Sequence, residues 1–216
     1  VTVPFPSHAC AVIDIGGDGE GTRPTFRLAI DPWLVGPCFH TGWWHSVIPP
    51  ADALELVESA DAIFISHDHS DHLHDESLEG VDRDVPIMTG GFSTESSAAA
   101  LRRLGFRTVL ALPLGRTIGI EGIPVPFALL KSGDDRDDCG MYLVAGGFSA
   151  LFTVDANQIN SGVLPAGLDL LASNFAGGAS GYPTSYDSLE PDERRRRALR
   201  LKVGAATGAL TMAKKA

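Results

Sequence analysis

Short apolar runs bounded by glycine, proline and aspartate recur along most of the chain. Runs of about four to eight apolar, β-branched or aromatic residues between turn residues are typical of strands. The turn-rich segment 16–21 joins the first two runs into a hairpin, and Gly146-Gly147 joins two later ones. We expect strands at residues 9–15, 25–30, 62–65, 86–88, 108–112, 117–120, 125–130, 141–145, 150–154 and 168–172.

Three other segments place their apolar residues at helical spacing. The first follows Pro49-Pro50, and proline suits the start of a helix. Gly204 and Gly208 weaken the last, because glycine costs about 1 kcal/mol relative to alanine inside a helix. We expect helices at residues 51–59, 94–104 and 191–212. This order fits one α/β domain over 1–216, with two packed sheets and helices outside, and no repeat or linker divides it.

Size and charge narrow the function classes. With 216 residues and 44% hydrophobic content, the chain can bury a substantial core. The net charge of -10 argues against nucleic acid or an anionic membrane surface as the main partner, and we expect a small-molecule substrate. No run approaches the ~20 apolar residues of a membrane span. Pro4 and Pro6 disrupt any signal-peptide pattern, and the three cysteines form no paired motif, so we expect a cytoplasmic protein.

The densest chemistry lies at Ser66–Leu73, directly after the apolar run Ala62–Ile65. The ligand-type residues there follow the pattern H-x-H-x-D-H and are His67, His69, Asp71 and His72. Imidazoles and carboxylates are the groups that hold zinc, iron or manganese. Residues at i and i+2 of a strand end share one face, and the last two ligands follow in the next turn. The spacing favours two adjacent metal positions, against the alternative of a solvated, inert cluster.

This motif after a short strand resembles that of the metallo-β-lactamase superfamily. Five further segments look like the catalytic domain of CMP-N-acetylneuraminate hydroxylase and its bacterial relatives. They are Ser7–Cys10, Asp31–Pro37, Gly42–Trp44, Thr153–Asp155 and Asn174–Gly181. The resemblance implies a four-layer αββα sandwich with the metal site at one edge between the sheets. It also implies an iron centre that activates oxygen with the help of a Rieske iron–sulfur module.

We therefore expect a metal-dependent oxygenase or hydroxylase that acts on a small polar metabolite. The resemblance favours one or two divalent ions, with iron ahead of zinc or manganese. The chain lacks the paired cysteines and histidines of a Rieske cluster, so electrons would come from a separate electron-transfer protein. The superfamily leaves two alternatives open. One is a hydrolase of an ester, lactone or phosphodiester, and the other is a non-catalytic relative with an incomplete metal site.

The resemblance assigns further roles. Asp155, at the end of the apolar run 151–154, matches the carboxylate that bridges two metals, and its alternative is a turn-forming residue. Asp71 doubles as a ligand and as the catalytic general base for metal-bound water. Asp68 is kept as a neighbour of the site only. Asp31 is predicted from its own position at the end of the run 25–30: it is expected to lie behind a ligand imidazole and accept a hydrogen bond from it, with an Asp-Pro turn as the alternative.

The later chain departs from the superfamily pattern. No histidine follows His74, although two more metal-binding imidazoles are usual there. The acidic run 131–138 lies near the position where one of these two histidines is expected. We take Asp135 as the first choice for a carboxylate that replaces it. Such a site would suit iron or manganese better than zinc, and a solvated loop is the alternative. The chain also stops after a helix, so the fold is expected to lack its last C-terminal elements.

Several residues are expected to meet substrate or to be structural. Trp43 and Trp44 line a pocket in one interpretation and pack in the core in the other. Gly178 and Ser180 lie in a glycine-rich segment whose N–H groups suit an anionic group, with a flexible turn as the alternative. The histidines without a spacing partner are expected to be structural: His8, His40, His45 and His74.

Overall fold

The computed structural model describes the chain except for residues 18–22, 157, 175–182 and 184–185. Its first sheet has the strand order β1-β2-β3-β4-β5. The hairpin of β1 and β2 is antiparallel, and β3, β4 and β5 add to it in parallel. The strands are β1 Ala11–Ile15, β2 Phe26–Ile30, β3 Ala62–Ile65, β4 Ile87–Gly90 and β5 Val109–Leu112.

The second sheet has the order β10-β9-β8-β7-β6. Its first four strands along the chain form an antiparallel meander, and β10 returns parallel to β9. Gly146 and Gly147 turn the chain between β8 and β9 with φ of 56° and 87°, which a residue with a side chain adopts only with strain. The strands are β6 Thr117–Ile120, β7 Ile123–Lys131, β8 Cys139–Ala145, β9 Phe148–Val154 and β10 Leu170–Ser173.

The main core lies between the two sheets. Alternate residues of a strand point to opposite faces, so Phe64 and Met88 face the second sheet and pack with Phe127 and Met141. Each such side chain is almost fully buried, which is worth roughly 1.5–3 kcal/mol per large apolar residue. The central strand β3 is apolar on both faces because it is covered on both.

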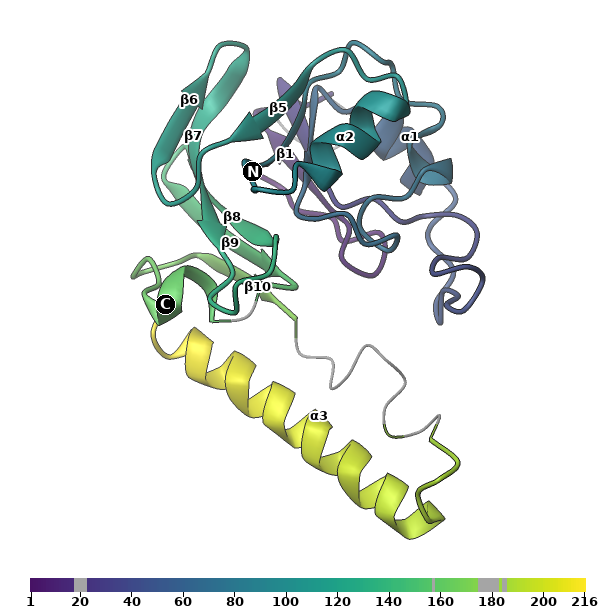
Figure 1. The fold of residues 1–216 in the computed structure, drawn as a ribbon. Helices are drawn as coiled ribbons and strands as arrows, with labels where there is room; N and C mark the ends of the chain where they lie inside the picture. Colours follow the sequence, from purple (N-terminus) through teal and green to yellow (C-terminus); the bar gives the residue numbers. More distant parts are fainter. Residues whose placement is uncertain (18–22, 157, 175–182, 184–185) are drawn as a thin grey trace.

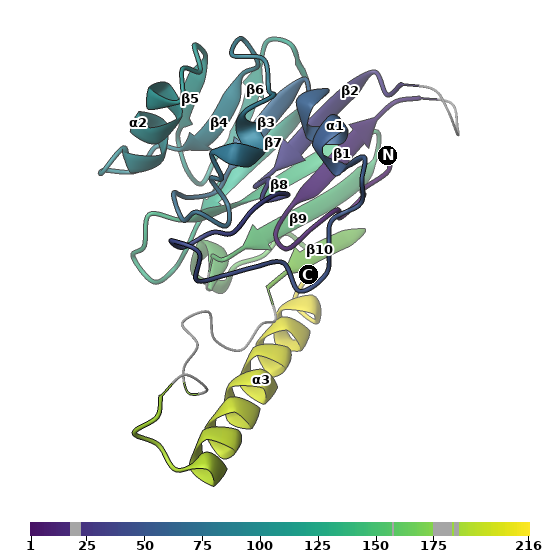
Figure 2. The same ribbon diagram turned by 90° about the vertical axis from the view of Figure 1, so that its right-hand side faces the viewer.

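A second core lies on the outer face of the first sheet. Helices α1 (Ala53–Glu58) and α2 (Ser96–Arg103) cover this face (Figures 1 and 2). Val57 of α1 and Leu101 of α2 are fully buried there and pack with β3 and β4 residues such as Ile63 and Ile87. A short 3₁₀ helix, η1 (Glu76–Leu78), joins this layer after the histidine-rich segment.

The fourth layer of the expected sandwich is only partly present. Within the described residues, the outer face of the second sheet is covered by the 3₁₀ turn η2 (Ile159–Gly162) and by Leu164 and Leu168. Helix α3 (Pro191–Ala213) instead projects from the body of the molecule (Figures 1 and 2). Its carboxyl end contacts β10, where Ser173 Oγ lies 3.8 Å from Met212 Sδ. None of the described helices is long and apolar enough to cross a membrane.

The expected elements agree with the structure. Each expected strand overlaps an observed one, with ends that differ by a few residues, and 62–65 and 117–120 match in full. All three helices are confirmed, and α3 runs through Gly204 and Gly208, where a Cβ would meet nothing within 4 Å. The two-sheet α/β fold is therefore confirmed.

Candidate metal centre

Strand β3 delivers the histidine-rich segment to one edge of the two sheets. After Ile65 the chain folds into a turn in which the amides of His72 and Leu73 both donate to the carbonyl of His69, at 3.0 and 2.8 Å. This turn brings His72 back beside His67, so that their ring centroids lie 4.2 Å apart. His67 and His72 are buried, whereas His69 is exposed at the mouth of the site.

The ligand-type residues gather into two groups, within each of which the ligand atoms lie within 4.8 Å of one another. The first group is His67, His69 and Asp155, and the second is His8, Asp71 and His72. The groups are adjacent, because Asp155 Oδ2 of the first lies 3.7 Å from His72 Nε2 of the second. Asp155 at the end of β9 therefore lies between the two groups.

Asp31 fixes the second imidazole from behind. It follows β2 with a left-handed φ of 42°, and its buried carboxylate accepts from the Ser66 amide at 2.7 Å. His72 Nδ1–H donates to Asp31 Oδ2 at 2.9 Å. Because a carboxylate only accepts, this bond places the proton of a neutral His72 on Nδ1 and leaves the Nε2 lone pair facing the site.

Ser66 connects Asp31 to His67 and fixes the tautomer of that imidazole in the same way. Its hydroxyl donates to Asp31 Oδ2 at 2.6 Å, which uses its single proton. The 2.9 Å contact between Ser66 Oγ and His67 Nδ1 must then be donated by the imidazole. His67 Nε2 is thereby left as a lone pair, so one aspartate and one serine set the tautomers of two imidazoles.

The site contains buried polar atoms that no hydrogen bond satisfies. Among the described residues these include His67 Nε2, His72 Nε2, Asp71 Oδ1 and both carboxylate oxygens of Asp138. An unsatisfied buried polar group costs about 1–3 kcal/mol, and more when it is charged. Nitrogen lone pairs and carboxylate oxygens directed at one small space are the donor set of a divalent metal ion. The residues present therefore fit metal ions.

Electrostatics favours the ligand forms of His67 and Asp71. For His72, burial opposes the charged form, but the carboxylates of Asp31 and Asp71 outweigh it and raise its pKa, so a bound metal ion would take the place of the Nε2 proton. Burial, with the neighbouring His72 and His69, lowers the pKa of His67 to about 2, so that this imidazole is neutral. Burial opposes ionisation of Asp71, but hydrogen bonds from His72 and His8 outweigh it and hold its pKa below the usual range. Metal ligation needs a neutral imidazole and an ionised carboxylate, and these two residues supply them.

The acidic run before β8 brings a different carboxylate to the site from the one expected. Asp135 is exposed, has a φ of 62° and belongs to neither group. Asp138 is buried and its Oδ1 lies 3.6 Å from His67 Nδ1. Burial and the nearby Asp155 raise its pKa to about 7. Its position directly before the buried strand β8 was the available signal, since strand ends point into this edge.

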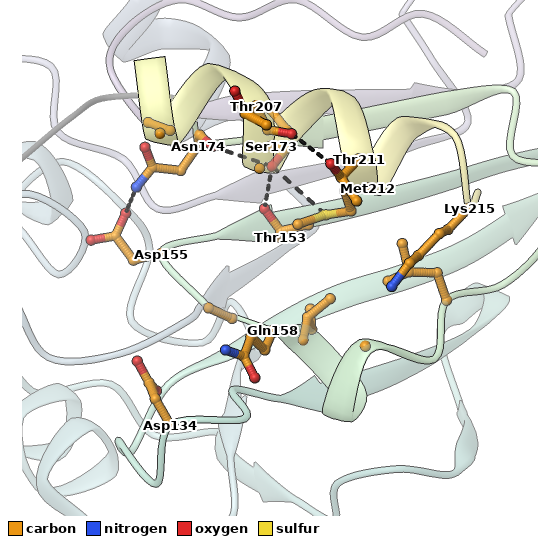
Figure 3. A pocket seen from close by; sticks show the side chains of 18 residues that line it. Asp134, Thr153, Asp155, Gln158, Ser173, Asn174, Thr207, Thr211, Met212 and Lys215 are labelled. Carbon is orange, nitrogen blue, oxygen red and sulfur yellow. Dashed lines mark hydrogen bonds between the residues drawn. The ribbon is translucent and has the colours of Figure 1, made fainter. Parts of the chain in front are cut away.

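Two cavities flank the centre. One of about 560 Å³ is lined by His8, Trp33, Trp43, Trp44 and His45. Trp44 is exposed and Trp43 half-buried, so neither is a core residue. The other, of about 610 Å³, lies between α3 and the second sheet, and Asp155 and Asn174 line it (Figure 3).

In the second cavity the Asn174 side-chain amide donates to Asp155 Oδ1 at 3.0 Å (Figure 3). This bond holds the carboxylate from the side opposite His72. The other two residues expected to meet substrate, Gly178 and Ser180, lie outside the described residues.

His8 is the residue that sequence reasoning missed. It was expected to be structural because it has no spacing partner, yet its Nε2 lies 3.0 Å from Asp71 Oδ2. The turn Ser7–Cys10, closed by a 3.0 Å hydrogen bond from the Cys10 amide to the Ser7 carbonyl, delivers it just before β1. Spacing along the chain could not reveal a contact across 63 residues.

Comparisons with known proteins agree with this fold and site. No protein-family model matches the chain. The chain is 36% identical over 197 residues to the cytidine monophosphate-N-acetylneuraminic acid hydroxylase of Asterias rubens. This alignment covers 86% of the chain and 28% of the relative. The Mus musculus protein of the same name is 33% identical over 86% of this chain and 32% of its own length. The chain thus spans about three tenths of these relatives.

Solved structures share the fold at lower identity. CmlA, a diiron beta-hydroxylase from Streptomyces venezuelae, matches with a TM-score of 0.61 and 20% identity, over 92% of this chain and 39% of its own. The isothiocyanate hydrolase from Delia radicum gut bacteria matches with a TM-score of 0.51 and 18% identity, over 69% of this chain and 60% of its own.

The fold defines the class as a domain of the metallo-β-lactamase fold, with two groups of ligand-type residues at one edge of its sheets. Within that class, the chain is homologous to one segment of the cytidine monophosphate-N-acetylneuraminic acid hydroxylases.

Proposed function

We propose that this domain is the metal-binding, oxygen-activating part of a hydroxylase that acts on a small polar metabolite. The observation that carries the proposal is the pair of buried imidazole nitrogens, His67 Nε2 and His72 Nε2, which find no hydrogen-bond partner among the residues that the structure describes. Identity of 33–36% to named hydroxylases supports hydroxylation over other metal-dependent chemistry. The nucleotide sugar in the names of those relatives is the first substrate to assay.

The residues that would hold two ions are the two groups around the bridging carboxylate of Asp155. We propose iron as the metal, since the ligands that this chain offers are imidazoles and hard carboxylates and none is a thiolate. Bound iron supplies the redox chemistry that activates oxygen. The buried Asp138 lies beside His67 Nδ1, on the side of the ring away from Nε2, and is proposed to hold this imidazole in place from behind.

The other residues of the chain position these groups. Asp31 and Ser66 hold the His67 and His72 rings with Nε2 toward the metals. Asp71, kept ionised by its hydrogen bonds, would hold the second ion and would be the carboxylate base beside any water that this ion binds. The cavity beside Trp43 and Trp44 is proposed to receive the substrate, since flat aromatic faces suit a sugar or nucleobase. Electrons are proposed to come from a separate electron-transfer protein.

Anaerobic purification with metal analysis, followed by oxygen uptake after chemical reduction, tests this function. The expected result is two irons per chain and oxygen consumption that depends on the reductant. The His67→Ala, His69→Ala double variant is expected to lose metal and oxygen uptake, whereas His40→Ala, an exposed histidine outside both groups, keeps them. Tightly bound zinc with turnover of a lactone or phosphodiester would contradict the hydroxylase and favour a hydrolase.

A further inference from the structure

We infer that His8, from the turn before the first strand, is a ligand of the second metal position. This inference rests on the proposed metal centre and adds to it the residue that completes its second half. His8 supplies an imidazole from the turn before β1 and forms one group with Asp71 and His72.

Geometry places His8 on the metal side of its neighbours. Its Nε2 lies 3.0 Å from Asp71 Oδ2, and His72 Nε2 lies 3.3 Å from the same oxygen. Three ligand atoms from three residues thus surround one point. The side chains of Asp71 and His72 are almost fully buried, whereas that of His8 is 39% exposed. The second metal position is therefore closed on the protein side and reached from solvent past His8.

A hydrogen bond alone does not explain this arrangement. His8 Nε2–H donating to Asp71 satisfies one carboxylate oxygen, but His72 Nε2 and Asp71 Oδ1 stay buried without partners. His72 donates from Nδ1 to Asp31, so in its neutral form the Nε2 lone pair faces Asp71 and His8 and is free to bind a cation. A metal ion among the three residues satisfies all of these atoms, and the His8 imidazole then carries its proton on Nδ1.

The surroundings of His8 hold its ring in position. The ring meets Trp33 edge-on with centroids 5.4 Å apart and Trp43 with centroids 6.3 Å apart. Both tryptophans also line the 560 Å³ cavity, and so does His8 itself. The second metal position therefore opens on the cavity proposed for substrate, and His8 is the ligand between the two.

Cobalt(II) titration under anaerobic conditions tests the inference without activity. The parent is expected to bind two cobalt ions per chain, whereas His8→Ala binds one with unchanged affinity and the second at least tenfold more weakly. His40→Ala is the matched control and is expected to bind two. Far-UV circular dichroism and urea unfolding check that His8→Ala folds like the parent.

A cysteine variant gives a direct signature of coordination. His8→Cys is expected to show a new thiolate-to-cobalt charge-transfer band that is absent from His40→Cys and from the parent, whose three cysteines are buried. Two cobalt ions in the parent with unchanged binding in His8→Ala, or no new band in His8→Cys, would overturn the inference while leaving the proposed function intact. A parent that binds no metal would contradict the proposed function itself.

Discussion

Single residues at the centre differ in whether they face a metal ion or hold another residue in place. The H-x-H-x-D-H spacing was enough to nominate His67, His69, Asp71 and His72, and the structure brings all four together. Asp31 and Asp155 were nominated from strand ends and also lie at the site. His8 and Asp138 were not, because their roles depend on a long-range contact and on burial, and neither leaves a local pattern.

Because Asp31 positions the imidazole of His72, its substitution is expected to lower the affinity for metal ions. Asp31→Asn keeps the shape of the side chain but removes the anion that accepts from Ser66 and His72. Loss of such a partner behind a ligand costs about 10–100-fold in metal affinity, which anaerobic cobalt titration measures. Asp75→Asn, at an exposed aspartate, is expected to leave affinity unchanged. Equal affinities of Asp31→Asn and the parent would rule out this role.

The raised pKa of Asp138 predicts how the free energy of unfolding of the metal-free protein depends on pH. Burial and Asp155 raise its pKa to about 7, against about 3.9 in an unfolded chain. Between these values the folded state holds the additional proton, so its contribution to the free energy of unfolding falls as the pH rises from about 4 to 7. Urea unfolding between about pH 4 and 7 is expected to show that the free energy of unfolding falls less with rising pH in Asp138→Asn than in the parent. Exposed Asp135→Asn should follow the parent, and parallel profiles for all three would contradict the assignment.

Secondary-structure elements were the most predictable level of this protein. Short apolar runs and turn residues located each strand because both sheets are built from local patterns, as β3 (Ala62–Ile65) illustrates. The packing of α3 could not be predicted in the same way. Its described residues include none that is fully buried, so its pattern carries little information on which face meets the second sheet.

The central strand β3 is predicted to carry a large share of the stability. Phe64 is fully buried between the sheets and lies two residues before the metal-binding segment. Phe64→Ala is expected to lower the free energy of unfolding by about 3–5 kcal/mol, because it leaves a cavity in the main core. Denaturant unfolding measures the loss. Exposed Ile48→Ala serves as the control, and a similar small change in both variants would show that the core was misplaced.

At the scale of the whole molecule, the centre depends on segments that are distant in sequence. The turn before β1 brings His8, the end of β3 brings the H-x-H-x-D-H residues, and the end of β9 in the other sheet brings Asp155. The packing of the two sheets is therefore what brings Asp155 to the two groups of ligand-type residues. The sequence predicted the superfamily and most of the residues in the two groups, but the contacts of His8 and Asp155 with them exist only in the folded chain.

The central claim is that two metal ions lie side by side at this edge of the sandwich. X-ray absorption spectroscopy of the anaerobically iron-loaded protein tests it most directly. We predict two irons per chain, nitrogen and oxygen first-shell ligands, and metal–metal scattering at about 3.5–4 Å, the separation usual for two-metal sites. One iron per chain, or two without metal–metal scattering, would contradict the account.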